Sequence, residues 1–381
     1  MATAERLTPP TARPAFQLGQ DHQDLYEALH RHAADADRAA QPAEPVLASL
    51  RASGLLGAAV PVEFGGLGGD ARLTNRVVED VAMLDPSVAI ILFQHYAVSA
   101  RISEWGTTGQ KEHYLPRLAD GRWLAASAWS ESGAGAAKRN LSTTAAPTED
   151  SWVLNGAKTF TTGAGLAQIY LVLAQSSAPR QDSAVYGSDG QSFFLVEATA
   201  PGLVADTGMD LVGMRASATG FVELHSCSVP ADALLGPVGK ATQVIADVRQ
   251  SGATLGAVSL GIAEAAFQLA LAHARRRGLA DAQAIRHRLA DLAALVEGAR
   301  ALVERTGRRD GDEPGATTLH SKLVASTVSE QVCLEAQRLL GSAGYLRDHP
   351  LNKLAHDARA VGLMGPTNDL CRELVSAAWT A

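Results

Sequence analysis

Apolar side chains recur at helix-like spacing through the first third of the chain, between residues 21 and 118. Leu25 and Leu29 illustrate the repeat, in which positions three or four apart share one face of a helix. The glycine-rich run 60–70 interrupts the pattern, and helical spacing then returns up to a last short helix that starts at 109–112. This part of the chain therefore predicts a helical unit.

A different pattern fills residues 125–236. Short apolar runs are separated by Gly, Pro, Asn and Asp, which is typical of strands joined by turns. These strands favour a compact antiparallel β-barrel or sandwich. The polar stretch 175–191 is expected to form an exposed loop. The predicted strands contain residues 152–154, 169–173, 192–196 and 220–224.

From residue 241 the helical spacing returns, and it predicts four helices that contain Ile262, Leu289, residues 319–340 and residues 367–378. The predicted fold is α+β and mostly α. It divides into an N-terminal helical domain (1–124), a middle β domain (125–238) and a C-terminal four-helix-type bundle (239–381).

Composition narrows the class of protein. The chain is 46% hydrophobic and carries a net charge of −7, so a nucleic-acid partner, which needs a basic surface, is not expected. The three cysteines include no CxxC pair, and the histidines show no metal-ligand spacing, so neither a disulfide framework nor a metal site is expected. No apolar run is long enough to span a membrane, and residues 1–17 are interpreted as a loose leader. A cytoplasmic enzyme is the expectation.

Four groups of residues, in order along the chain, carry a family resemblance. The first is VPVEFGGLGG at 60–69, and the second combines SAWSESGAG at 127–135 with NGAKTFTTGA at 155–164. The third is GMRASAT at 213–219. The fourth joins QRLLGSAGY at 337–345, HDAR at 356–359 and GPTND at 365–369. Together they resemble the acyl-CoA dehydrogenase superfamily over residues 25–380.

The resemblance implies a flavin cofactor, FAD or alternatively FMN, in a cleft between the β domain and the bundle. It assigns contacts with the flavin ring to the backbone of Trp129 and Ser130 and to the strand end Phe160, Thr161 and Thr162. A threonine hydroxyl both donates and accepts hydrogen bonds, which suits a ring nitrogen that changes protonation. Simple strand propensity also explains the two threonines.

Gln337 and Gly341 resemble the pair that contacts the ADP part of the cofactor of a neighbouring subunit. The resemblance therefore implies a homodimer or homotetramer. A helix end at Gly341 is the alternative explanation of that glycine.

The carboxylate that removes the α-proton of a thioester in this family is missing from its expected position. The family's segment (Y/F)-E-G-T corresponds here to Met364, Gly365, Pro366 and Thr367, which places Gly365 at the position of the glutamate. A second family position for the base falls at or near Ser251, which is a weak catalytic candidate. Met364 and Gly365 are expected to face the substrate.

Two further features resemble the flavin-dependent monooxygenases built on this fold. Phe93-Gln94-His95-Tyr96 is similar to their Q-(N/S)-H-(F/Y), and residues 161–164 are similar to their (S/T)-T-G-A. His95 then becomes a catalytic candidate that stabilises a flavin hydroperoxide, and Tyr96 a substrate contact. A half-buried helix histidine is the alternative interpretation of His95.

Three hypotheses follow. The favoured one is a monooxygenase that uses reduced flavin, supplied by a separate reductase, and O2 on a small organic substrate. The second is a dehydrogenase of an acyl-CoA or acyl-carrier-protein thioester with a non-standard base. The third is a catalytically silent subunit of a hetero-oligomer. The family's R-x-x-F-G is also absent from the segment after Arg277, where the loop is short, which indicates either weaker cofactor binding or a flavin that arrives as a diffusible reduced species.

Overall fold

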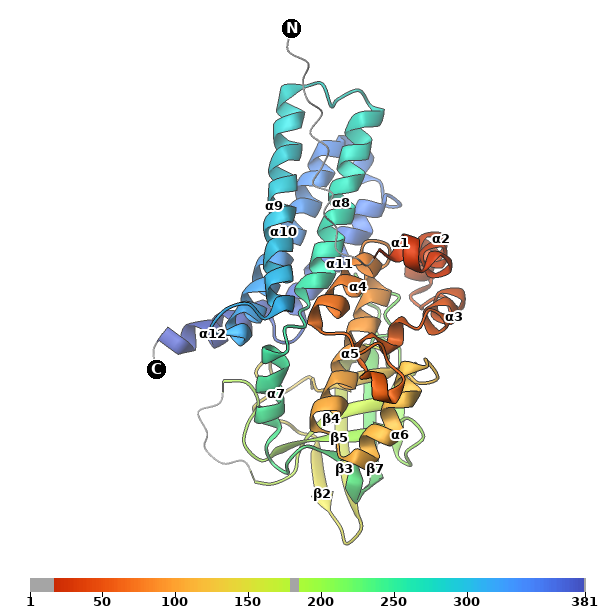
Figure 1. Ribbon diagram of the computed structural model, residues 1–381, viewed down its shortest axis with the longest axis vertical. Helices are drawn as coiled ribbons and strands as arrows, with labels where there is room; N and C mark the ends of the chain where they lie inside the picture. The colour runs from red at the N-terminus through yellow and green to blue at the C-terminus, as the bar shows by residue number, and fades with distance from the viewer. Residues whose placement is uncertain (1–16, 179–184, 380–381) are drawn as a thin grey trace.

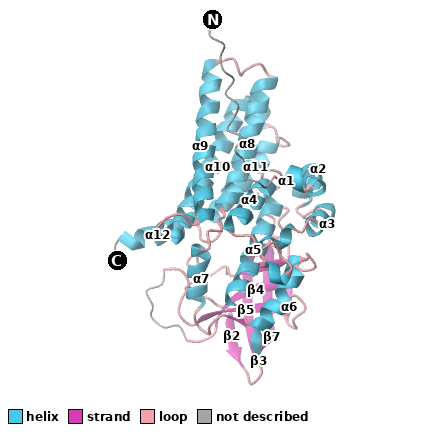
Figure 2. Ribbon diagram, viewed as in Figure 1, coloured by secondary structure: helices cyan, strands magenta, loops and turns pink. Residues whose placement is uncertain are grey.

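The structure is a computed structural model that describes residues 17–178 and 185–379. Figure 1 shows an elongated molecule, with a sheet at one end, a bundle of long helices at the other and the N-terminal helices beside their junction. All but one residue of the predicted leader 1–17 lie outside the described residues. The α+β, mostly helical fold class is confirmed: helix, sheet and helix follow one another along the chain (Figure 2).

The N-terminal third is helical, as predicted. Its helices are α1 (Leu18–Asp21), α2 (Gln23–Ala39), α3 (Glu44–Ala52), α4 (Ala71–Ala82), α5 (Pro86–Trp105) and α6 (Thr108–Ala119). Side chains fix two of the boundaries: Asp70 accepts the N–H groups of Arg72 and Leu73 at the start of α4, and Thr107 forms a capping box with Gln110 at the start of α6. The glycine-rich run folds into the 3-10 turns η1 (Leu55–Ala59) and η2 (Val62–Phe64).

The middle of the described chain forms one sheet of eight strands in the order β6-β7-β3-β2-β4-β5-β8, with β1 paired to β4. The four predicted strands are confirmed within β3, β4, β5 and β7. The sheet is mixed rather than purely antiparallel, because β4 is parallel to both β1 and β2. The strands are β1 (Ala125–Ala128), β2 (Thr144–Pro147), β3 (Ser151–Thr161), β4 (Ile169–Gln175), β5 (Gln191–Glu197), β6 (Leu203–Asp206), β7 (Gly220–Pro230) and β8 (Leu234–Leu235).

Strand β4 shows why its sequence is continuously apolar. Ile169, Leu171 and Leu173 belong to a core cluster that includes residues of α5 and α6, whereas Tyr170 and Val172 belong to the core on the other face. Successive strand residues point to opposite faces, so a strand that is covered on both sides has no polar position.

The expectation of an exposed loop at 175–191 is wrong for its described second half. Residues 179–184 lie outside the described part, but Tyr186, Gly187 and Ser188 are buried. The carboxamide of buried Gln191 donates to the carbonyl oxygen of Lys138 at 2.8 Å, and Gly187 N–H donates to the carbonyl of Ala137. Internal hydrogen bonds to another loop thus replace water for these polar groups.

The C-terminal helices are α7 (Ala241–Gln250), α8 (Gly256–Arg276), α9 (Gln283–Arg308), α10 (Pro314–Leu340), α11 (Pro350–Leu363) and α12 (Asn368–Ser376). Helices α8 to α11 form the long bundle of Figure 1, in which α11 is an element that the sequence pattern did not predict. By length and composition alone α8 could cross a membrane, but most of its apolar window is buried among α4, α9, α10 and α11.

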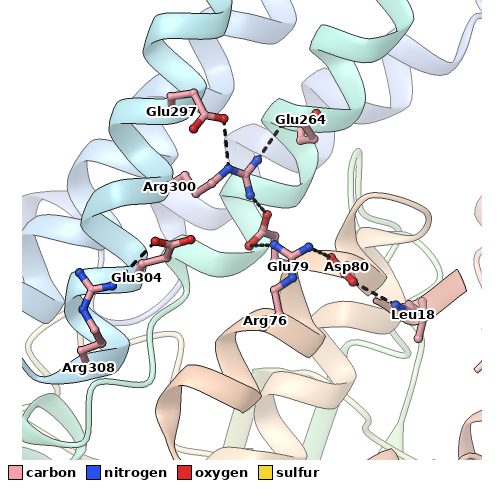
Figure 3. Close-up of polar contacts among 9 residues, drawn as sticks. All are labelled: Leu18, Arg76, Glu79, Asp80, Glu264, Glu297, Arg300, Glu304 and Arg308. Atoms are coloured by element: carbon pink, nitrogen blue, oxygen red, sulfur yellow. Dashed lines mark hydrogen bonds and ion pairs between the residues drawn. The ribbon is translucent and has the colours of Figure 1, made fainter. Parts of the chain in front are cut away.

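A buried ion network joins the N-terminal helices to the bundle (Figure 3). Arg300 of α9 contacts Glu264 of α8 at 2.8 Å and also Glu79 of α4. Arg76 contacts Glu79 and, at 3.0 Å, Asp80, which accepts the N–H of Leu18. Burial raises the pKa of Glu79, and the two arginines oppose that rise. The network therefore joins α4, α8 and α9 through buried ion pairs.

Candidate functional site

The loop that follows β1 is fastened to strand β3 by a buried ion pair. Lys158 Nζ lies 2.6 Å from Glu131 Oε1, and the two side chains are 0% and 4% exposed. Glu131 also accepts the N–H groups of Ser142 and Thr143, and Ser130 accepts the N–H of Thr159 at 2.8 Å. Burial lowers the pKa of Lys158 to about 8, and the Glu131 charge opposes that fall. The loop 130–143 is thereby held against the strand that ends at Thr161.

A bulge at the end of β3 separates the three predicted flavin contacts. The register shifts between Lys158 and Thr161, and Phe160 adopts φ 52°, which turns its ring out to 65% exposure. Thr162 follows two residues later, and its Oγ1 is 3.2 Å from that of Thr219, which contacts Ser217. Thr161 is completely buried, so the prediction that its hydroxyl faces a cofactor is wrong.

The same strand end is tied to the bundle. Gly163 N–H donates to the carbonyl of Ser217, and in the same segment Met214 N–H donates to Asp357 Oδ1 of α11 at 2.6 Å. A Cβ at Gly213 would lie 2.5 Å from the carbonyl oxygen of His356, so this close packing requires glycine. The contact fixes α11, whose C-terminal end leads into Met364 and Gly365, relative to the sheet.

Two residues that the sequence analysis did not single out surround Gly365. A Cβ built on Gly365 would stand 3.4 Å from the Tyr186 hydroxyl and 3.7 Å from Lys138 Nζ. Both side chains are buried, and Lys138 Nζ lies 5.9 Å from the centre of the Tyr186 ring. The position at which relatives are expected to carry a carboxylate therefore opens onto an amine and a phenol.

Electrostatic interactions connect the Gly365 position to the loop 130–143. Burial lowers the pKa of Lys138 to about 8, and the carboxylate of Glu131 opposes the fall. The Lys138 charge in turn contributes to the lowered pKa of Lys158. Burial raises the pKa of Tyr186 well above its usual value, so its hydroxyl stays protonated. One carboxylate thus acts on both lysines, which couples the loop 130–143 electrostatically to the amine beside position 365.

His95 and Tyr96, the residues predicted for oxygen chemistry and substrate contact, are structural. His95 Nε2 donates to the carbonyl oxygen of Leu56 at 3.0 Å, and its Nδ1 accepts the N–H of Ala125 at 3.3 Å. Burial lowers its pKa to about 4, so the ring is neutral at pH 7. Tyr96 donates to the carbonyl of Leu55 at 2.6 Å. With both ring nitrogens engaged and no exposed surface, the catalytic assignment of His95 is wrong, as is the substrate role of Tyr96.

Ser251 closes the turn after α7. Its Oγ donates to the carbonyl of Val248 at 2.8 Å and accepts the N–H of Ala253, which leaves the hydroxyl engaged by its own backbone. It lines a cavity of about 390 Å³ together with Glu104, Trp105, Asp247, Gln250 and Arg309. Its weak catalytic candidacy gains no support from these contacts.

Gln337 and Gly341 lie far from strand β3 of their own chain. Helix α10 begins beside α7, where Gly315 N–H donates to Gln250, and its 27 residues carry Gly341 roughly 40 Å along the bundle. Gln337 donates to Asn352, and Gly341 is exposed with no atom near a built Cβ. A cofactor contact by this pair therefore stays a prediction that requires a second subunit.

The residues present fit a flavin ring. The exposed Phe160 ring offers a stacking face, and the Thr162 hydroxyl and the Trp129–Ser130 backbone offer polar groups beside it. A cavity of about 1500 Å³ between the N-terminal helices and α11 is lined by none of the candidate residues. The link from α8 to α9 spans only residues 277–282, so the predicted loss of the R-x-x-F-G segment corresponds to a short turn.

Fold and site together define a three-part flavin-dependent oxidoreductase, and comparison with known proteins specifies the class. Sequence models described as the N-terminal, middle and C-terminal domains of acyl-CoA dehydrogenase match residues 23–122, 126–227 and 243–379. The chain belongs to the acyl-CoA dehydrogenase family, whose members use FAD.

Three relatives illustrate the similarity. Probable acyl-CoA dehydrogenase FadE25 of Mycobacterium tuberculosis is 30% identical over 380 residues, which cover 95% of this chain and 96% of the relative. Cyclohexane-1-carbonyl-CoA dehydrogenase of Geobacter metallireducens is 33% identical and covers 90% and 91%. The structure of butyryl-CoA dehydrogenase from Megasphaera elsdenii superposes with a TM-score of 0.87 at 28% identity, covering 96% and 97%. These names support a dehydrogenase and give no support to the favoured monooxygenase hypothesis.

Proposed function

We propose that this protein is an FAD-dependent dehydrogenase that introduces an α,β double bond into an acyl-CoA or acyl-carrier-protein thioester. The observation that carries the proposal is that the 213–219 segment joins the strand end at Thr162 to Asp357 of α11, the helix that leads into Gly365. This connection supports a proposal in which the cofactor contacts and the substrate-facing position share one junction. The names of the relatives point to the same reaction class.

In this proposal each group has one task. Bound FAD would accept a hydride from the β-carbon of the thioester. Phe160 would stack on the flavin ring, Thr162 and the Trp129–Ser130 backbone would hydrogen-bond to it, and the Glu131–Lys158 pair keeps the loop in place. Met364 and Gly365 would line the substrate side. Reoxidation would use an electron-transfer protein or O2 rather than a dedicated flavin reductase.

The quaternary arrangement is part of the proposal. Gln337 and Gly341 complete the ADP part of the site in a second copy of the chain, since they lie at the far end of α10 from their own flavin strand. A homodimer is the smallest assembly that satisfies this geometry, and a dimer of dimers is compatible with it. We include a cytoplasmic location and FAD, rather than FMN, in the same proposal.

Anaerobic titration of the purified holoenzyme with acyl-CoA thioesters of several chain lengths tests the function. Bleaching of the flavin absorbance, with formation of the 2-enoyl thioester by mass spectrometry, is the expected result. Flavin that binds but is bleached by no CoA or pantetheine thioester would favour the silent-subunit hypothesis, to which the absence of a carboxylate at Gly365 also points. A purified protein that binds no flavin would contradict the proposal.

A further inference from the structure

The side chain of Lys138 occupies the space into which a carboxylate at position 365 would extend. Its Nζ lies 3.7 Å from a Cβ built on Gly365, and Lys138 belongs to the loop between β1 and β2 rather than to the segment after α11. The family's base and this amine would therefore reach the same place from different parts of the chain. The inference drawn from this geometry rests on the proposed function.

The backbone holds Lys138 in a conformation that a lysine rarely adopts. Its φ is 52°, in the left-handed region that costs a residue with a Cβ about 1 kcal/mol. Three contacts keep it there: Gln191 donates to its carbonyl at 2.8 Å, its N–H donates to Gly135, and Ala137 accepts the N–H of Gly187. A strained residue that is fixed by a buried glutamine and aimed at the substrate side indicates a functional constraint.

We propose that Lys138 is the catalytic base that replaces the missing carboxylate. The neutral amine removes the α-proton of the thioester: the Cα–H bond breaks, an N–H bond forms, and the electron pair remains as the enolate of the thioester. The β-hydride then passes to the bound flavin, which is the oxidant. The Lys138 ammonium returns its proton to solvent after turnover.

Charge and burial explain why Lys138, rather than Tyr186, takes this role. Burial lowers the pKa of Lys138 to about 8, so roughly one molecule in ten carries the free amine at pH 7 and half do at pH 8. The Glu131 carboxylate prevents a larger fall, and among the described residues Lys158 and Tyr186 are the other titratable groups that lie near the amine. Burial keeps the Tyr186 phenol protonated, so it does not serve as the proton acceptor.

Exchange of the α-protons provides a test that does not depend on flavin reduction. The probe is 3,3-dimethylbutyryl-CoA in D2O, whose β-carbon carries no hydrogen and therefore cannot be oxidised. The wild-type holoenzyme should incorporate α-deuterium at a rate that rises about tenfold per pH unit and levels off near pH 8. Lys138→Met should slow exchange by at least about 100-fold.

Three further variants separate the possible roles. Lys138→Arg keeps the charge but cannot lose its proton, so it should lose exchange as Lys138→Met does. Lys138→Met combined with Gly365→Glu should recover exchange, with a pH dependence set by a carboxylate, because a Cβ fits at position 365 in ordinary van der Waals contact. Lys322→Met is the matched control: this lysine is also buried with a pKa lowered to about 8, but its Nζ is bound to Asn368. It should keep the wild-type pH dependence.

The outcomes distinguish the two proposals. If acyl-CoA thioesters bleach the wild-type flavin while Lys138→Met exchanges α-protons at the wild-type rate, the assignment of Lys138 is overturned and the dehydrogenase proposal stands. Exchange that does not depend on pH between about pH 6 and pH 9 overturns it as well. A wild-type holoenzyme that neither exchanges the probe nor is bleached by any thioester overturns both.

Discussion

The imidazole Nε2 of His95 lies 3.0 Å from the carbonyl oxygen of Leu56, inside the junction of α5, η1 and the sheet. Its pKa is about 4 in the folded protein, against an ordinary value of 6.5. Between these pH values only the unfolded chain binds the proton, so the stability that His95 contributes is complete above pH 6.5 and is lost as the pH falls towards 4. The full effect is about 3 kcal/mol.

His95→Gln tests this relationship, since its amide can still donate to Leu56 but does not titrate. The difference in unfolding free energy between pH 7 and pH 5 should be smaller in the variant by about 2 kcal/mol, measured by denaturant titration. Thioester oxidation should persist in the folded variant. An activity loss with unchanged stability would return His95 to the active site.

The buried Glu131–Lys158 pair should be costly to break. Lys158→Met leaves the Glu131 carboxylate buried without its counter-ion, so we expect the free energy of unfolding to fall by about 3 to 5 kcal/mol and flavin affinity to fall with it. Adding Glu131→Gln to Lys158→Met removes the orphaned charge and should recover much of the stability. Two single variants whose losses simply add would argue against a coupled pair.

The Arg300 network should matter for stability but not for chemistry. Arg300→Met leaves Glu79 and Glu264 buried without their shared counter-ion, and we expect a loss of about 3 kcal/mol. The pKa of Glu79, already raised by burial, should rise further, so the variant should lose stability as the pH increases from acid towards neutral. Arg308→Met, whose side chain is 47% exposed, is the matched control and should change the unfolding free energy by less than about 0.5 kcal/mol.

Phe160 should contribute to flavin affinity rather than to folding. Its ring is 65% exposed, so Phe160→Ala removes little buried surface, while the loss of stacking should weaken flavin binding by roughly threefold to tenfold. Fluorescence titration of the apoprotein measures the affinity. Val204→Ala, another exposed apolar residue in the sheet, should leave it unchanged. Equal flavin affinity in the Phe160 variant and the wild type would remove this residue from the site.

The sequence analysis succeeded where local pattern and motif order carry the information. Most of the helices, four strands and the family were predictable because helical spacing and strand runs are local, and four motifs in order are specific; α11 was not predicted. It failed at Lys138 and Tyr186, which lie 48 residues apart and are brought together by hydrogen bonds from Gln191 and Gly187 to the loop of Lys138. The sequence around Lys138 and the sequence around Tyr186 do not predict that contact.

His95 shows the opposite failure. Its motif was similar to one with a catalytic histidine, but a motif does not reveal whether both ring nitrogens are engaged by backbone groups. Thr161 failed for a related reason: the bulge at Phe160 changes which strand residues point outward, and a bulge is set by the pairing with β7 rather than by β3 alone.

The position of Glu131 in the loop between β1 and β2 has a mechanical consequence. A carboxylate at position 365 would follow the end of α11 and would therefore belong to the helical bundle. Here Lys138 and Glu131 belong to one loop, and Glu131 pairs with Lys158 of β3 and acts through its charge on Lys138. The proposed proton acceptor is therefore positioned by the same domain as the strand proposed to face the flavin.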